Sequence, residues 1–103
     1  MLEVKKSRSY KDLEVWQVAV ELVKSIYEIT EKFPWVERFE LTQQIRRAAV
    51  SIPSNIAEGQ FRNSSREFKQ FLSIALGSAA ELETQLIIAN DINYLPSKNR
   101  PFS

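Results

Sequence analysis

The stretch that decides the fold is residues 44–59, with the sequence QIRRAAVSIPSNIAEG. Apolar residues recur in it at spacings of three and four, which places them on one side of an α-helix. They are Ile45, Ala48, Ala49, Ile52 and Ile56. Gly59 follows at the position where a left-handed C-cap would end such a helix. The pattern therefore predicts a buried helix over about residues 38–58.

Pro53 lies inside this pattern. A proline lacks the amide hydrogen, and its ring collides with the carbonyl four residues earlier, which costs about 3 kcal/mol in an ordinary helix interior. Ser51, Ser54 and Asn55 surround it, and short polar side chains can bond the backbone groups that the proline leaves free. We predict that Pro53 kinks the helix, and we expect Pro53 and Asn55 to have structural roles.

A helix is also predicted over about residues 12–32, with Asp12 as its N-cap. Two neighbouring apolar stripes run along it, and together they form an arc wide enough to touch more than one helix. The first stripe is Leu13, Trp16, Val20, Val23 and Tyr27; the second is Val15, Ala19, Leu22, Ile26 and Ile29. Phe33-Pro34 should end this helix, because the residue before a proline avoids the α conformation.

The third predicted helix covers about residues 64–92 and opens with a capping box formed by Ser64 and Glu67. A heptad-like seam follows: Phe68, Leu72, Ala75, Ala79, Leu82, Leu86 and Ala89. Gly77 lies in a run of small residues, which we interpret as a site of tight helix packing inside the bundle.

The two ends of the chain do not continue these patterns. Residues 1–11 are polar and mostly basic, which indicates a flexible arm, and residues 96–103 contain Pro96 and Pro101 without apolar periodicity, which indicates a non-helical tail. The sequence thus predicts one all-α domain over residues 12–95, an up-and-down antiparallel helical bundle.

Several ordered blocks resemble the four-helix-bundle family of 23S rRNA intervening-sequence proteins, which has relatives among the accessory proteins of diversity-generating retroelements. The blocks are residues 12–17, 33–34, 41–49 and parts of 64–86, and the resemblance covers about residues 10–95. It implies a bacterial protein that forms a homopentameric ring, with RNA, DNA or a reverse transcriptase as partners. The family's fourth helix has no counterpart in residues 96–103, where the sequence departs from the family pattern.

Composition excludes several classes of function. The 103 residues suffice for one domain, the net charge is +1, and cysteine and histidine are both absent. The chain therefore lacks thiolate nucleophiles and the commonest metal ligands, and no set of nucleophile, base and orienting group can be assembled. We expect no enzymatic activity, no metal and no cofactor. No continuous apolar run approaches the roughly 18 residues of a membrane span, so we expect a cytoplasmic protein without a membrane partner.

The candidate site consists of basic residues that could hold phosphates: Arg46, Arg47, Arg62, Arg66 and Lys69. Arg62, Arg66 and Lys69 are spaced to share one side of the start of the third helix, where positive charge opposes the helix dipole. The alternative is a solvated surface that Glu40, Glu58 and Glu67 balance. Phe61 could stack on a base, but we favour packing over the end of the bundle.

These observations predict a non-enzymatic helical bundle protein that forms a homo-oligomer and offers a basic surface to RNA, DNA or a nucleic-acid enzyme. The alternative is a protein-interaction scaffold with no nucleic-acid role. Salt dependence separates the two, because phosphate contacts weaken steeply with salt whereas an apolar protein interface barely responds.

Overall fold

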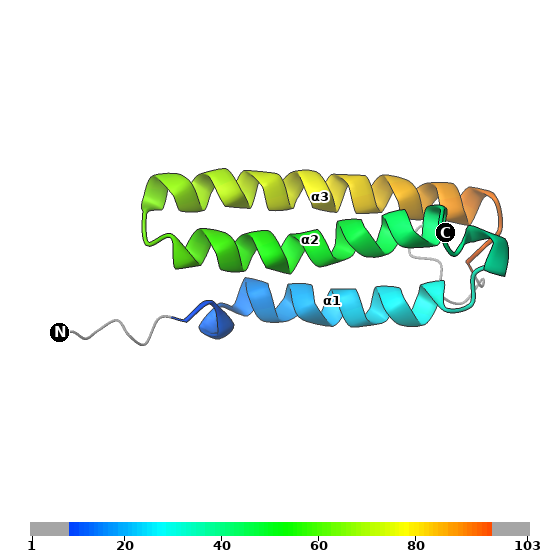
Figure 1. The fold of residues 1–103 in the computed structure, drawn as a ribbon, viewed down its shortest axis with the longest axis horizontal. Coiled ribbons are helices and arrows are strands. Elements are labelled where there is room, and N and C mark those ends of the chain that lie inside the picture. Colours follow the sequence, from blue (N-terminus) through cyan, green and yellow to red (C-terminus); the bar gives the residue numbers. More distant parts are fainter. Residues whose placement is uncertain (1–8, 96–103) are drawn as a thin grey trace.

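The structure, a computed structural model, describes residues 9–95. Three long helices run antiparallel to their neighbours: α1 (Glu14–Thr30), α2 (Leu41–Phe61) and α3 (Ser65–Asp91) (Figure 1). Two short 3₁₀ turns, η2 (Tyr10–Asp12) and η3 (Trp35–Glu37), precede α1 and α2. The predicted all-α, up-and-down bundle is confirmed, and residues 9–95 contain no fourth helix. The tail and most of the predicted basic arm lie outside the described residues.

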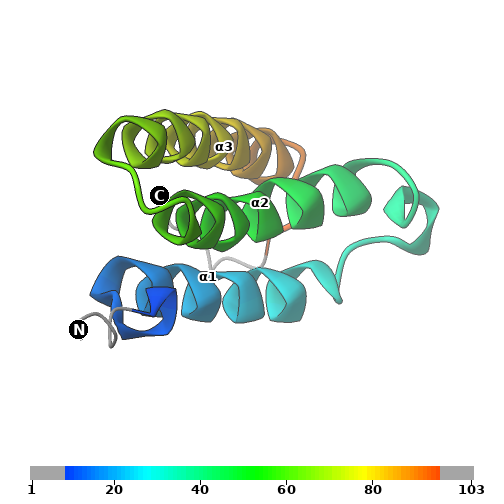
Figure 2. The same ribbon diagram turned by 60° about the vertical axis from the view of Figure 1, so that its left-hand side comes forward.

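Helix α2 lies between the other two helices (Figures 1 and 2). It packs against α1 and more extensively against α3, whereas α1 and α3 make almost no contact with each other. The arrangement therefore resembles three corners of a four-helix bundle. Each outer helix has one long helical neighbour within the described part of the chain.

The core is built around the stripe that the sequence of α2 predicts. All five of its members are buried, and Ile45 and Ala49 are completely inaccessible to solvent. From α1 the core receives Ala19 and Ile26, and from α3 it receives a seam in which Ala75, Leu82 and Ala89 are buried. The predicted seam of α3 is thus confirmed, with Leu72, Ala79 and Leu86 packed half-buried against the same core.

Gly59 does not cap its helix, so this prediction was wrong. Helix α2 continues to Phe61, and the left-handed conformation occurs instead at Asn63, where φ is 58°. Gly59 is buried against α3: a Cβ atom there would lie 2.8 Å from Cβ of Phe71 and 3.0 Å from Cδ1 of Phe68. The glycine therefore permits the close approach of α2 and α3.

The surroundings of Gly77 also differ from the predicted tight packing. Ala75 and Ser78 are buried in the bundle, but Gly77 is exposed, and a Cβ atom there would meet nothing within 4 Å. The small size of Gly77 therefore serves no packing within the described chain.

Pro53 is buried inside a single uninterrupted α2 helix. Two residues after the proline, the side-chain amide of Asn55 donates to the carbonyl oxygen of Ser51 at 2.8 Å and to its Oγ at 2.9 Å. The Ser51 hydroxyl lies 2.8 Å from that of Ser78 on α3. The polar residues around Pro53 thus link α2 to α3, and the kink itself stays a prediction.

The predicted N-cap of α3 is found in the structure, whereas the predicted N-cap of α1 is not. The side chain of Ser64 caps α3 by accepting a hydrogen bond from the amide of Glu67 at 3.3 Å, which confirms this half of the predicted capping box. Helix α1 begins slightly later than expected, with Leu13 as its N-cap. Asp12 belongs to η2, because the Ser9 side chain caps that turn and the Leu13 amide bonds the carbonyl of Tyr10.

Aromatic residues lie at both ends of the bundle. Trp16, half-buried, meets the ring of Tyr10 edge-on at 5.4 Å. At the other end the ring of Tyr94 packs 5.4 Å from that of buried Phe33, and its hydroxyl donates to Oε2 of Glu37 at 2.7 Å. This hydrogen bond raises the pKa of Tyr94 above its ordinary value, with burial and the Glu37 charge acting in the same direction. The segment after α3 is thereby tied to the α1–α2 connection.

Candidate functional site

Helix α1 carries an apolar stripe that no other described segment covers. Val15, Val18 and Leu22 repeat at spacings of three and four, and they are 53%, 62% and 37% exposed. The second predicted stripe of α1 is therefore divided: Ala19 and Ile26 enter the core, whereas Val15 and Leu22 remain at the surface. The reason is that α1 packs on one long helix only.

Helix α3 carries two further apolar stripes, one on each side of its buried seam. Leu76 and Ile87 lie on one side; Ile74, Ile88 and Ile92 lie on the other. All five side chains are more than two-fifths exposed, and Leu76 is 72% exposed. Exposed apolar side chains gathered on one helix are a common mark of an interaction surface.

Within the described residues, α3 is also the one helix whose length and composition would allow it to cross a membrane. Its most apolar window has a mean hydropathy of 1.3 and is 17% buried. A search for continuous apolar runs in the sequence overlooks this helix, because Glu81 and Glu83 interrupt the run. Helices of soluble proteins can pass the same test of length and composition, and the two carboxylates would be costly in lipid.

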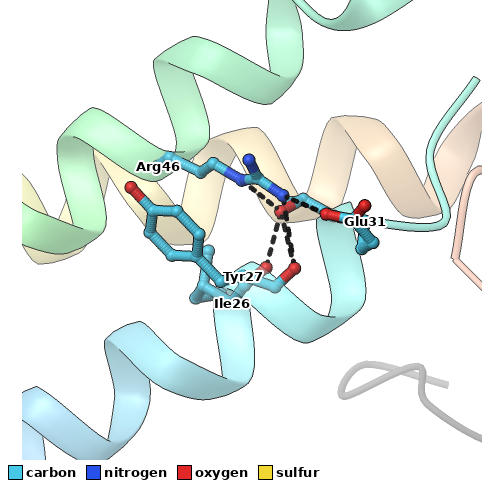
Figure 3. A network of polar contacts seen from close by, with 5 residues as sticks. Ile26, Tyr27, Glu31 and Arg46 are labelled. Carbon is cyan, nitrogen blue, oxygen red and sulfur yellow. Dashed lines mark hydrogen bonds and ion pairs between the residues drawn. The ribbon is translucent and has the colours of Figure 1, made fainter. Parts of the chain in front are cut away.

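The five candidate basic residues do not form one patch. Arg46 is a structural link between helices (Figure 3). Its Nε donates to Oγ1 of Thr30 at 2.8 Å, and its Nη2 lies 3.3 Å from both the Tyr27 carbonyl oxygen and Oε1 of Glu31. The guanidinium also lies 4.3 Å from the centre of the Tyr27 ring. Because this side chain is only 20% exposed and pairs with Glu31, it binds α2 to the end of α1.

Arg62 is likewise engaged within the chain. It is the C-cap of α2 rather than a member of α3, so it does not share a helical face with Arg66 and Lys69. Its guanidinium pairs with Glu58 at 2.9 Å and with Glu67 at 3.8 Å. For Arg62 the alternative interpretation, a surface cation balanced by carboxylates, therefore describes the structure.

Of the five candidate residues, three are exposed and form no ion pair with any described residue: Arg47, Arg66 and Lys69. Arg47 lies in the first half of α2, and the other two lie in the first turns of α3. The α2 helix separates them by about 20 Å, at about 1.5 Å per residue. Phe61, near the second group, is 80% exposed, so the prediction that it packs over the bundle end was wrong.

Next to Arg47 lies a cavity of about 530 Å³ between α1, the residues after η3 and the first half of α2. Its lining is Tyr27, Arg38, Phe39, Thr42, Gln43, Arg46, Arg47, Val50 and Ser51, and it includes three arginines and no carboxylate. Sequence reasoning missed Arg38. The helix predicted over about residues 38–58 started at Arg38, but α2 begins only at Leu41, and Arg38 is instead the C-cap of the short turn η3.

Comparison with known proteins assigns the family. A model of the family described as 23S rRNA-intervening sequence protein matches residues 11–100. The chain belongs to this family. This match confirms the family resemblance seen in the sequence. A separate comparison with curated proteins finds no match. Over residues 9–95 of this intervening-sequence protein, no cluster of three acidic side chains could hold a metal ion.

Proposed function

We propose that this protein is a non-enzymatic helical bundle that assembles with copies of itself through the uncovered apolar faces of α1 and α3. The supporting observation is that both outer helices carry exposed apolar stripes and that, among the described residues, each has α2 as its one long helical neighbour. Ser51, beside Pro53, hydrogen-bonds with Ser78 and Asn55, and neither partner is a base that could activate the hydroxyl as a nucleophile.

The energetics favour a partner for these faces. At about 25 cal/mol per Å², several hundred Å² of apolar surface left in water forgoes on the order of 10 kcal/mol. A small domain has a total stability of only about 5–15 kcal/mol. Covering the open faces would therefore matter to the stability of the folded chain as well as to assembly.

Another copy of the chain is the partner that these surfaces fit. The α1 stripe of one copy can meet an α3 stripe of the next, and such a head-to-tail contact closes into a ring when the rotation between copies permits. The family resemblance implies a ring of five copies. Glu81 and Glu83 on α3 argue for a protein partner and against insertion of this helix into lipid.

Replacing Val18 by glutamate should dissociate the assembly. Val18 is 62% exposed in the single chain, so the charge leaves the fold intact but becomes buried when a second copy covers α1. The midpoint concentration for assembly should rise at least about tenfold, which corresponds to about 1.4 kcal/mol. Sedimentation velocity over a dilution series measures it.

The matched control is Gln44→Glu, which adds the same charge at an exposed position of α2, away from the apolar stripes of α1 and α3. It should leave the midpoint within about twofold, since a solvated charge changes little. A wild-type chain that sediments as a cooperatively folded monomer at micromolar concentration would refute self-assembly, as would a Val18→Glu variant that assembles like the wild type.

A second candidate function is sequence-independent contact with RNA or DNA, either directly or beside a nucleic-acid enzyme. The observation in its favour is that Arg47, Arg66 and Lys69 are exposed and have no carboxylate partner among the described residues. Assembly would repeat these cations around a ring and concentrate positive charge that a single chain of net charge +1 lacks.

The test is filter binding of single-stranded RNA and duplex DNA across salt concentrations. Changing Arg66 and Lys69 together to alanine should reduce the slope of log affinity against log salt by about 0.7 to 0.9 for each phosphate that the variant no longer neutralises. Arg62→Ala is the control, because Glu58 and Glu67 already neutralise that residue. Absence of binding by the wild type at low salt would reject this function and leave a pure protein-interaction scaffold.

A further inference from the structure

We propose that the cavity beside α2 binds a nucleotide through its terminal phosphate, either as a free nucleotide or as the phosphorylated end of a strand. Such binding goes beyond self-assembly and uses a different surface. Gln43, Arg47 and Val50 of the cavity are exposed on the side of α2 opposite the buried residues Ile45 and Ile52.

Charge is the first argument for a phosphate ligand. Three arginines line the cavity, and one of them, Arg46, is neutralised by Glu31 at 3.3 Å. Arg38 and Arg47 form no ion pair with any described residue, so the lining retains two unbalanced positive charges. A phosphate monoester carries about −1.5 to −2 at pH 7, and the planar guanidinium fork suits its oxygens.

Preorganisation is the second argument. The guanidinium of Arg38 lies 4.5 Å from the centre of the Trp35 ring, and that of Arg46 lies 4.3 Å from the centre of the Tyr27 ring. The hydrogen bonds of Arg46 to α1 use its Nε and Nη2, so Nη1 remains available to a ligand (Figure 3). Side chains already held in place lose less conformational freedom when a ligand arrives.

The apolar part of the lining suits the remainder of a nucleotide. Phe39 is 76% exposed and offers an open ring face for a base to stack on, while Val50 and the ring of Tyr27 extend the apolar wall. The side-chain amide of Gln43 can bond the edge of a base or a sugar hydroxyl. A volume of about 530 Å³ lies within the ordinary range for small-molecule sites.

Isothermal titration calorimetry with adenosine 5′-monophosphate tests the proposal on the full chain. Saturable binding is expected, and it should weaken as the pH falls through the second phosphate pKa of about 6. The double variant Arg38→Gln, Arg47→Gln should lose at least about tenfold in affinity, since each charge-assisted hydrogen bond contributes roughly that factor or more.

The matched control removes two cations elsewhere. Arg66→Gln, Lys69→Gln changes the net charge equally and should alter the affinity less than about threefold, because those residues do not line the cavity. Equal losses in the two double variants would overturn the site in favour of general electrostatic attraction. No saturable binding of the nucleotide by the wild type at millimolar concentration would also overturn it.

Further titrations identify which part of the ligand is recognised and whether the ligand is a free nucleotide or a strand end. Adenosine and inorganic phosphate should each bind more weakly than the monophosphate; inorganic phosphate binding as tightly would overturn the role of the apolar wall. A short single-stranded RNA with a 5′-phosphate is compared with the same RNA carrying a 5′-hydroxyl. A preference for the phosphorylated strand over the free nucleotide identifies a strand end as the ligand, and the reverse order identifies a free nucleotide.

Because these titrations can be run on assembled and dissociated protein, failure to bind the nucleotide is distinguishable from failure to self-assemble.

Discussion

Replacing Ile45 by alanine should lower the free energy of unfolding by about 2–5 kcal/mol, the usual range for removing a large aliphatic side chain from a core. Ile45 is completely buried near the start of α2, the helix that both other helices pack against. Truncation therefore leaves a cavity in the close-packed core, and the surrounding structure relaxes into such a cavity only in part.

Urea unfolding followed by circular dichroism measures this loss, with all variants at one protein concentration because assembly contributes to apparent stability. Val50→Ala on the same helix is the control. Val50 is 40% exposed, so its truncation should lower the unfolding free energy by less than about 1 kcal/mol. Equal losses at the two positions would show that the side of α2 carrying Ile45 is not the core.

The same glycine-to-alanine change should have opposite effects at the two glycines of the chain. At Gly77 the new methyl group meets nothing within 4 Å, so Gly77→Ala should stabilise the helix by about 0.5–1 kcal/mol through its higher helix propensity. At Gly59 the methyl group would lie 2.8 Å from Cβ of Phe71, a contact that only a shift of the helix backbone can relieve.

Overpacking of this kind destabilises by about 1–3 kcal/mol and should outweigh the gain in propensity, so Gly59→Ala should unfold at lower urea than the wild type. Thermal or urea unfolding of both variants shows whether each substitution raises or lowers the free energy of unfolding. A stabilised Gly59→Ala variant would mean that α2 and α3 do not approach as closely as the structure shows.

The candidate site was less predictable than the fold, and the arginines show why. Arg46 and Arg62 look alike in the sequence, as cations on polar helical positions. Arg46 meets Thr30 and Glu31, which lie 16 and 15 residues earlier, and this pairing arises only when α1 folds back along α2. Arg62 meets Glu58 one turn away, and that pairing was foreseeable from the i,i+4 spacing.

Local pattern alone determined which parts of this chain are helical and which sides of α2 and α3 are buried. The stripe from Ile45 to Ile56, the seam from Ala75 to Ala89 and the cap at Ser64 depend on residues three or four apart, and helix geometry makes those neighbours regardless of the rest of the chain. Tertiary structure alone decided that Gly59 is a contact point rather than a cap, because its nearest neighbours, Phe68 and Phe71, belong to another helix. It also decided that Val15 and Leu22 stay exposed: a sequence pattern marks a residue as apolar, but only the positions of the other helices determine whether anything lies opposite it.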